Sequence, residues 1–144
     1  MQQNLHSSTK VLFVGSFDPF HEGHHSIVTR ALSIFDEVVV AVAVNPEKNC
    51  LYSIDERVER IRAEFKDEPR VTVDSFGGLT VDYCHSHGIK YIIKGVRNAV
   101  DFEYEKKQAD WNKRNGQVET VLLLAEPGLE NVSSTAIRKN TMNK

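Results

Sequence analysis

The chain has 144 residues, of which 40% are hydrophobic and 26% are charged, and its formal net charge at pH 7 is −2. These values predict a single globular domain over residues 1–144 that can bury a sizeable core. They exclude a general attraction to nucleic acid or to an anionic membrane surface, and no apolar segment is long enough to span a bilayer.

Residues 1–9 are polar and lack the apolar core of a signal peptide, so we expect a flexible N-terminal tail. The two cysteines, Cys50 and Cys84, are too few for a disulfide framework or a four-thiolate zinc site. They are expected to be free thiols in a reducing compartment, which favours a cytoplasmic protein.

Strand and helix patterns alternate along the rest of the chain. Near-continuous apolar runs are typical of parallel strands covered on both faces, and the segments between them have helical periodicity. Strands are expected at residues 11–15, 37–44, 70–74, 91–94 and 120–125. Helices are expected to begin near His25 and to cover about 53–65, 80–87, 101–114 and 134–139. This order predicts an α/β fold with a doubly wound, mainly parallel five-stranded sheet.

Residue types at the helix ends support these boundaries. Ser53 with Glu56 three residues later forms a capping box, and Gly88 and Gly116 are typical helix stops. The aromatic residues of the fourth helix, Phe102, Tyr104 and Trp111, are expected in packing or in a subunit contact rather than in chemistry.

The stretch from Gly15 to His24, with the sequence GSFDPFHEGH, connects the first strand to the first helix. A strand-to-helix turn directs free backbone N–H groups at whatever lies above it, and the helix dipole adds partial positive charge there. Two imidazoles, His21 and His24, lie in the same turn. The stretch therefore predicts an anion site, most simply a phosphate site.

Three interpretations of this stretch compete. The first is a plain connecting loop with solvated histidines. Residues His21 to His25 also match H-E-x-x-H, the zinc-protease pattern, but that pattern requires a continuous helix. Pro19 just upstream and Gly23 within the pattern favour the beginning of a helix instead. The third match is the nucleotidyltransferase signature [T/H]-x-G-H, filled by His21 to His24, and we favour it.

Further polar residues follow the other strands. Lys48 follows the second strand, the run from Lys94 to Arg97 comes after the fourth, and a run of hydroxyl residues, Ser133 to Thr135, follows the fifth. The carboxyl ends of parallel strands meet at one edge of a sheet, where ligands bind. We therefore expect these basic and hydroxyl groups to gather around the histidine turn and to bind phosphate.

From Lys10 to Lys139 the sequence resembles the bacterial phosphopantetheine adenylyltransferases, which have a Rossmann-like nucleotidyltransferase fold. The resemblance lies in Gly15–Pro19, His21-x-Gly-His24, Lys48 after Asn-Pro, Gly95–Arg97 with Asp101–Glu105, and Val132–Thr135. The histidine signature marks only the wider superfamily, whereas the Asp-Phe-Glu-Tyr-Glu run after Lys-Gly-Val-Arg is much narrower.

This resemblance implies an enzyme that transfers AMP from ATP to 4′-phosphopantetheine, giving 3′-dephospho-coenzyme A and pyrophosphate. The phosphate of the acceptor attacks in line, without a covalent enzyme intermediate. The resemblance also implies Mg²⁺ as a cofactor that assists with the triphosphate, with no dedicated metal site in the protein. Coenzyme A is implied as a feedback ligand and a homo-oligomer, usually a hexamer, as the assembly.

Particular residues acquire roles by the same resemblance. His24 would bond the α-phosphate, Ser16 both reacting phosphate groups, Lys48 the attacking phosphate, and Arg97 the nucleotide; these four form the implied catalytic set. The implied ATP-binding residues are Ser16, Phe17, His24, Gly95, Val96, Arg97, Glu105, Leu129, Glu130, Asn131, Val132, Ser133, Ser134 and Thr135. The implied acceptor-binding residues are Ser16, Lys48, Leu79, Thr80 and Lys94.

Two positions depart from the family pattern. Lys94 stands where arginine is usual, which replaces a bidentate fork with a point charge, and Thr80 replaces a more apolar residue. Other functions also stay open: a cytidylyltransferase or a nicotinamide-mononucleotide adenylyltransferase, which share the histidine signature, or a nucleotide-binding sensor without catalysis.

Overall fold

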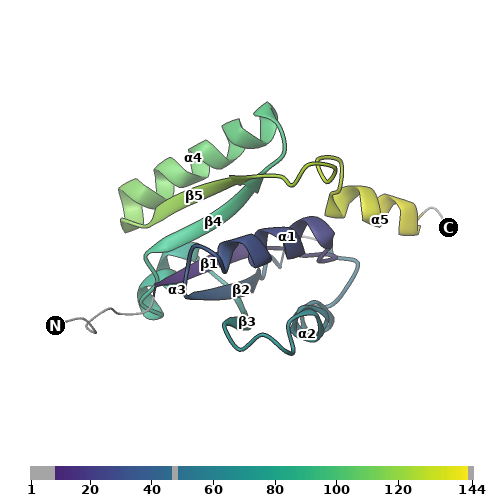
Figure 1. The fold of residues 1–144 in the computed structure, drawn as a ribbon, viewed down its shortest axis with the longest axis horizontal. Coiled ribbons are helices and arrows are strands. Elements are labelled where there is room, and N and C mark those ends of the chain that lie inside the picture. The colour runs from purple at the N-terminus through teal and green to yellow at the C-terminus, as the bar shows by residue number, and fades with distance from the viewer. Residues whose placement is uncertain (1–8, 47–48, 143–144) are drawn as a thin grey trace.

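The computed structural model of the protein describes residues 9–46 and 49–142 (Figure 1). The strands are β1 (Lys10–Gly15), β2 (Glu37–Ala43), β3 (Val71–Phe76), β4 (Tyr91–Val96) and β5 (Glu119–Leu124). The helices are α1 (Glu22–Ala31), α2 (Ile54–Glu64), α3 (Thr80–Ser86), α4 (Ala99–Gly116) and α5 (Ser134–Met142). The strands form one sheet in the order β3-β2-β1-β4-β5, and all pairs are parallel. The predicted α/β class and doubly wound sheet are confirmed.

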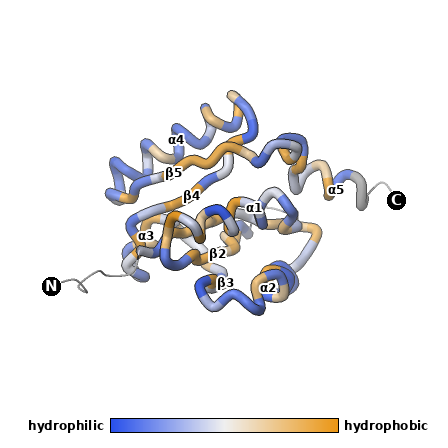
Figure 2. The backbone as a smooth tube through the Cα atoms, in the orientation of Figure 1, coloured by the Kyte–Doolittle hydropathy of each residue, from blue (hydrophilic) through white to orange (hydrophobic). Residues whose placement is uncertain are grey.

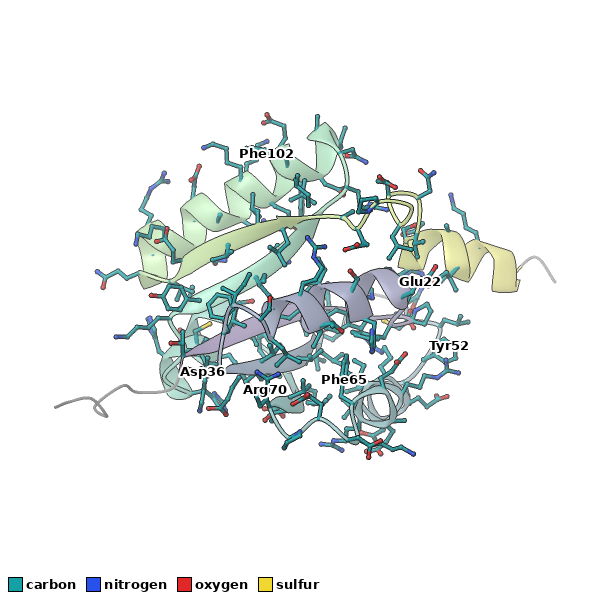
Figure 3. All side chains as sticks on the ribbon, viewed as in Figure 1. Glu22, Asp36, Tyr52, Phe65, Arg70 and Phe102 are labelled. Atoms are coloured by element: carbon teal, nitrogen blue, oxygen red, sulfur yellow. The ribbon has the colours of Figure 1, made fainter. Side chains whose placement is uncertain are left out.

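The sheet has a hydrophobic core on each face, because alternate residues of a strand point to opposite sides. On one side Val11 and Phe13 pack with residues of α1 and α2, and on the other Leu12 and Val14 pack with residues of α3. Phe65, just after α2, lies between α2 and α1 (Figure 3). The near-continuous apolar runs of the sequence are explained by this double coverage.

The sheet opens between β1 and β4. β1 pairs with β2 along its whole length, from Lys10↔Glu37 to Gly15↔Val42. Its register with β4 is restricted to Val11↔Tyr91 and Leu12↔Ile92. The chain winds from β1 toward β3 in one direction and from β4 toward β5 in the other, so this gap lies at the point where the winding reverses. Ligands of open α/β sheets bind at such a point.

Several boundaries differ from those expected. α1 begins at Glu22 rather than near His25, and α4 begins at Ala99 rather than Asp101. In both cases the residue before the helix caps it: the His21 ring accepts main-chain N–H bonds of α1, and Asn98 accepts one from Asp101. The third strand begins one residue later than expected and runs on to Phe76. The capping box of Ser53 and Glu56 is confirmed.

The two glycines expected to stop helices have different roles. Gly88 has φ +66, the left-handed conformation typical of a residue after a helix. Gly116 is instead the last residue of α4, and Gln117 takes the left-handed position with φ 56. A Cβ at Gly116 would lie 2.5 Å from Cγ1 of Val81, so glycine is required for α4 to approach α3.

α4 and β5 form an incompletely covered edge of the molecule. Among the residues of α4, all of which are described, Gly116 alone is fully buried. Leu122 and Leu124 of β5 are 38% and 74% exposed, and Figure 2 shows a hydrophobic β5 beside a largely hydrophilic α4. Phe102 projects outward from α4 (Figure 3). Phe102 is thus available for a subunit contact, whereas Tyr104 and Trp111 line a cavity that is described below.

Three further expectations concern single features. Cys50 and Cys84 are free thiols, as predicted. The tail expected over residues 1–9 lies outside the described residues except for Thr9, whose N–H donates to the Asp36 carboxylate over 2.7 Å. Within the part of the chain that the structure covers, no helix combines the length and apolar character needed to cross a bilayer.

Candidate active site

A cavity of about 340 Å³ occupies the gap between the carboxyl ends of β1 and β4. Its wall is completed by the amino-terminal end of α1, by α4 and by the segment that leads from β5 into α5. Gly95 at the end of β4 lets α1 approach, because a Cβ there would lie 3.0 Å from Cδ1 of Ile27. The lining residues used below are Ser16, Phe17, His24, Lys94, Arg97, Asp101, Glu105, Glu126, Ser134 and Arg138.

His24 is held by a reciprocal pair of hydrogen bonds at the start of α1. The main-chain N–H of His21 donates to Nδ1 of His24 over 3.1 Å, and Nδ1 of His21 accepts from the N–H groups of Gly23 and His24. A main-chain N–H can only donate, so Nδ1 of His24 must be unprotonated. The proton of the neutral ring therefore sits on Nε2, which is left available for a ligand in the cavity.

An aromatic enclosure keeps His24 neutral. Its ring makes edge contacts with Phe13 and Phe17 at centroid distances of 5.9 and 4.9 Å, and it stacks on His21 at 3.6 Å. Burial lowers the pKa of His24 to about 2, with further lowering by His21, Arg97 and Lys94. An imidazole of this kind donates a hydrogen bond near neutral pH but does not act as a general base through its lone pair, which is already occupied.

The zinc interpretation of His21 to His25 does not fit this geometry. The lone pair on Nδ1 of His21 is directed at the N–H groups of the helix, and burial together with Arg97 lowers its pKa to about 4. The ring of His25 stacks on Phe65 at 5.0 Å and lies 3.9 Å from the Glu64 carboxylate. The two outer histidines therefore face different surroundings, as expected for a helix start rather than a helix interior.

The turn after β1 has an unusual backbone. Phe17 is a buried residue with φ 48, in the left-handed region that bulky residues rarely occupy. Gly15 leaves room for its ring, because a Cβ at Gly15 would lie 3.0 Å from Cε1 of Phe17. This conformation places Ser16 and Phe17 in the cavity wall next to His24.

Two basic side chains are held at the cavity by acidic neighbours. Nε of Arg97 donates to Asp101 over 2.8 Å, and the main-chain N–H of Arg97 donates to the same carboxylate over 3.1 Å. These contacts with Arg97 lower the pKa of Asp101. Nζ of Lys94 lies 3.6 Å from Oε1 of Glu105. Both cations are therefore oriented before any ligand binds.

The segment leading into α5 closes one side of the cavity. The Ser134 hydroxyl donates to the carbonyl of Pro19 over 2.7 Å, and Arg138 donates to the carbonyl of Asp18 over 2.8 Å. Ser134 and Arg138 are four residues apart and share one face of the helix. They join the end of the chain to the turn after β1 and leave the first turn of α5 at the cavity.

A second cavity, of about 520 Å³, lies on the α3–α4 side of the sheet. Leu79 and Thr80, at the start of α3, line it together with Tyr104 and other residues of α4. Val14 and Lys94 line both cavities, so the two share a wall at the ends of β1 and β4.

Most of the residues singled out from the sequence meet here. The first cavity contains Ser16, Phe17, His24, Lys94, Gly95, Arg97, Glu105, Leu129, Val132, Ser133, Ser134 and Thr135, and the second contains Leu79 and Thr80 with Lys94. Val96 is buried in the core instead, and Glu130 accepts a hydrogen bond from the N–H of Gly128 within its own turn. Asn131 is an exposed turn residue away from the lining. Lys48 lies outside the described residues.

Sequence reasoning assigned no site role to three charged residues that line the first cavity. Asp101 could have been found as an acidic residue in the first turn of the helix that follows Arg97, and Arg138 from its spacing four residues after Ser134 on one helix. Glu126, which lies 3.6 Å from Arg30, gave no comparable signal.

The fold and this site define a nucleotidyltransferase. A family model described as cytidylyltransferase-like matches residues 12–140. A bifunctional NMN adenylyltransferase/ADP ribose pyrophosphatase from Francisella tularensis superposes with a TM-score of 0.72 at 16% identity, covering 95% of this chain and 43% of that one. A NadR protein in complex with NAD and AMP-PNP superposes with a TM-score of 0.63 at 17% identity, covering 95% of this chain and 43% of that one. At these identities the superpositions establish the fold.

Sequence similarity identifies the family within that class. A phosphopantetheine adenylyltransferase from Bacteroides fragilis is 45% identical over 130 residues, which cover 90% of this chain and 87% of that protein. One from Flavobacterium psychrophilum is 43% identical over 129 residues, covering 90% and 85%. The chain belongs to the phosphopantetheine adenylyltransferase family, and the resemblance described above is confirmed.

Proposed function

We propose that this protein transfers AMP from ATP to 4′-phosphopantetheine. A phosphate oxygen of the acceptor attacks the α-phosphorus, the new P–O bond forms as the bond to the β-phosphate breaks, and pyrophosphate leaves. The products are 3′-dephospho-coenzyme A and pyrophosphate. The observation that carries this proposal is the neutral Nε2–H of His24, in a cavity that also contains two oriented cations.

His24 serves as a hydrogen-bond donor to the α-phosphate. Negative charge accumulates on the phosphoryl oxygens as the acceptor approaches, and a fixed donor stabilises that charge without reorganisation. The attacking phosphate is already an anion, so the reaction requires no base, in agreement with an imidazole whose lone pair is occupied.

The charged and hydroxyl groups around His24 bind the rest of the nucleotide. Arg97, held by Asp101, faces the phosphates, and Ser16 lies between them and the acceptor. Ser133 to Thr135 and the first turn of α5 receive the β- and γ-phosphates, because a helix N-terminus presents free N–H groups to anions. Glu105 lies on the adenosine side.

The second cavity receives the acceptor. Its position behind a shared wall lets the pantetheine arm lie along Leu79 and Thr80 while the phosphate reaches Lys94. Lys48, on the residue pattern of the family, holds the same phosphate. Lys94 binds the acceptor phosphate as a point charge, whereas an arginine would bind it through two parallel N–H groups.

The phosphates of ATP would hold most of the Mg²⁺ ligand positions in this site. Each carboxylate of the first cavity already lies beside a basic side chain, as in the pairs Arg97–Asp101, Lys94–Glu105 and Arg30–Glu126. No cluster of three or more His, Cys, Asp or Glu residues occurs among the described residues. Mg²⁺ keeps several waters and binds largely through substrate phosphates. When bound it neutralises phosphate charge, while the protein chiefly orients the phosphates.

Assembly and feedback follow the family as proposals of the same kind. The exposed edge of α4 and β5, with Leu124 and Val100 at 74% and 78% exposure, supports a homo-oligomer, in the family a hexamer. Coenzyme A, which contains both an adenosine part and a pantetheine arm, is the proposed feedback ligand.

The deciding experiment offers purified protein ATP and Mg²⁺ with one acceptor at a time and measures pyrophosphate release. Release with 4′-phosphopantetheine, but not with nicotinamide mononucleotide, is the expected result, and CTP in place of ATP tests for cytidylyl transfer. Turnover with another acceptor alone would assign a different nucleotidyltransferase. Tight ATP binding without turnover on any acceptor would assign a nucleotide sensor.

A further inference from the structure

Arg57 is a buried arginine outside both cavities. It lies in α2, its exposure is 4%, and neither cavity described above includes it in its wall. In the described part of the chain its side-chain hydrogen-bond partners are all main-chain carbonyls: Ser16 at 2.8 Å, Tyr52 at 3.1 Å and Ser53 at 3.3 Å. A buried charge is costly unless it is well hydrogen-bonded, so these contacts define a specific structural position.

The contact with Ser16 determines the orientation of one peptide group in the active site. The C=O and N–H of a trans peptide point in opposite directions. Since Arg57 holds the Ser16 carbonyl on the α2 side, the N–H of Phe17 points away from α2. Among the described residues this N–H donates no hydrogen bond, and Phe17 itself lines the nucleotide cavity.

Phe17 requires such an anchor. Its φ of 48 is unfavourable for a bulky residue, and a residue of this kind persists only where the surroundings hold it. Its ring is fixed against His24 on one side, and the buried Asp18 next along the chain accepts from the N–H groups of Leu51 and Tyr52 over 2.7 and 2.9 Å. Arg57 binds the carbonyl of the same Tyr52, so Asp18 and Arg57 both connect the turn after β1 to the segment before α2.

We propose that Arg57 is a positioning residue for adenylyl transfer: it holds the Ser16–Phe17 peptide so that the Phe17 N–H donates to a phosphate oxygen of the nucleotide beside His24. This inference rests on the proposed nucleotide site. It adds a residue of α2 that lies outside the cavity, acts through the backbone of Ser16 and Phe17, and does not touch the substrate.

The test compares Arg57→Met and Arg57→Lys with Arg60→Met. Arg60 is the matched control because it lies on the same helix and its guanidinium covers the Tyr52 ring at 3.9 Å. We expect Arg57→Met to lower kcat/KM for ATP on the order of 10- to 100-fold, since a single preorganised donor contributes about that much or more. Arg57→Lys should show an intermediate loss, because one ammonium cannot reproduce the fork. Arg60→Met should match the wild type.

Binding of ATP and of adenosine separates positioning from general damage. Adenosine lacks phosphates, so Arg57→Met should weaken ATP binding and leave adenosine binding unchanged. An unchanged ratio of the two affinities would overturn the proposal. If wild-type protein binds ATP but releases no pyrophosphate with 4′-phosphopantetheine, the proposed function fails, while the affinity ratio still decides the role of Arg57.

A measurement on unsubstituted protein covers the case in which Arg57→Met does not fold. Selective ¹⁵N labelling of phenylalanine marks seven amides, and Phe17→Leu identifies the resonance of Phe17. We expect this resonance to shift on addition of ATP and to stay in place on addition of adenosine. A Phe17 amide that is indifferent to ATP would refute the inference.

Discussion

At the scale of single residues, His24 combines two hydrogen-bonding tasks in one ring. Nδ1 accepts from the main chain of His21 and completes the start of α1, and this contact leaves the proton on Nε2, facing the cavity. The hydrogen bond that caps α1 therefore also fixes the tautomer of His24.

His24→Ala should lower kcat by on the order of 100-fold or more, with a modest change in ATP affinity, because the lost donor matters most in the transition state. Steady-state kinetics with both substrates measures this. His25→Ala is the control, since the His25 ring contacts Phe65 of the neighbouring segment. A kcat within a few-fold of the wild type would refute the role of His24.

The protonation of His21 and His24 gives stability a defined pH dependence. Burial lowers the pKa of His21 to about 4 and that of His24 to about 2. Below the unfolded pKa of about 6.5 the unfolded chain binds protons that the folded chain does not, so the free energy of unfolding falls as pH decreases. For His21 this loss continues to about pH 4.

Urea denaturation at pH 7, 6 and 5 measures this effect. Each ring contributes a slope of up to about 1.4 kcal/mol per pH unit. His24→Gln should reduce the slope, because glutamine at this position can complete the same capping box but does not titrate. An equal slope in the variant and the wild type would show that the pKa of His24 is the same in the folded and the unfolded chain, which would contradict the lowered pKa.

At the scale of elements, strands and helices could be predicted because their signals are local. The apolar runs of β1 and β2 directly reflect burial on both faces. The start of α1 was misplaced because an imidazole at His21 caps this helix, whereas the standard signals are Ser, Thr, Asp and Asn. Gly116 was recognised as an end signal, but its reason, contact with Val81, is a tertiary one that spacing does not contain.

The candidate site could be predicted only where residues match a family motif or lie at strand ends. Arg57 lies within a helix of ordinary amphipathic pattern, and nothing in its spacing indicates that it reaches Ser16, 41 residues earlier in the chain. Asn131, in contrast, is implied by the resemblance to bind ATP but is exposed in a turn. A sequence motif indicates which segments lie near the site, while tertiary packing determines which of their side chains face the ligand.

The attachment of α5 makes its own prediction. Ser134→Ala and Arg138→Met each remove a hydrogen bond to the turn after β1, worth about 1 kcal/mol, so each should raise the KM for ATP several-fold. Lys139→Met, an exposed position on the same helix, is the control. Unchanged KM values in both variants would show that α5 holds its place by other contacts.

At the scale of the whole molecule, the edge formed by α4 and β5 is the region that one subunit does not cover. Leu124→Glu should shift the protein to a lower molecular mass in light scattering, because a charge cannot be buried unpaired in an apolar interface. Ile34→Glu adds the same charge at another exposed apolar position, 57% exposed, and should leave the mass unchanged. A parent protein that is already monomeric would refute the proposed assembly.

The wall common to both cavities has a consequence for inhibition. The two cavities meet at Val14 and Lys94, so one molecule can extend from the first cavity into the second. Joining an adenylate to a pantetheine-like chain by a short tether makes occupation of the second cavity intramolecular, at millimolar effective concentration. Such a bisubstrate compound should bind far more tightly than either fragment, and its optimal tether length would report the separation between the donor and acceptor phosphates.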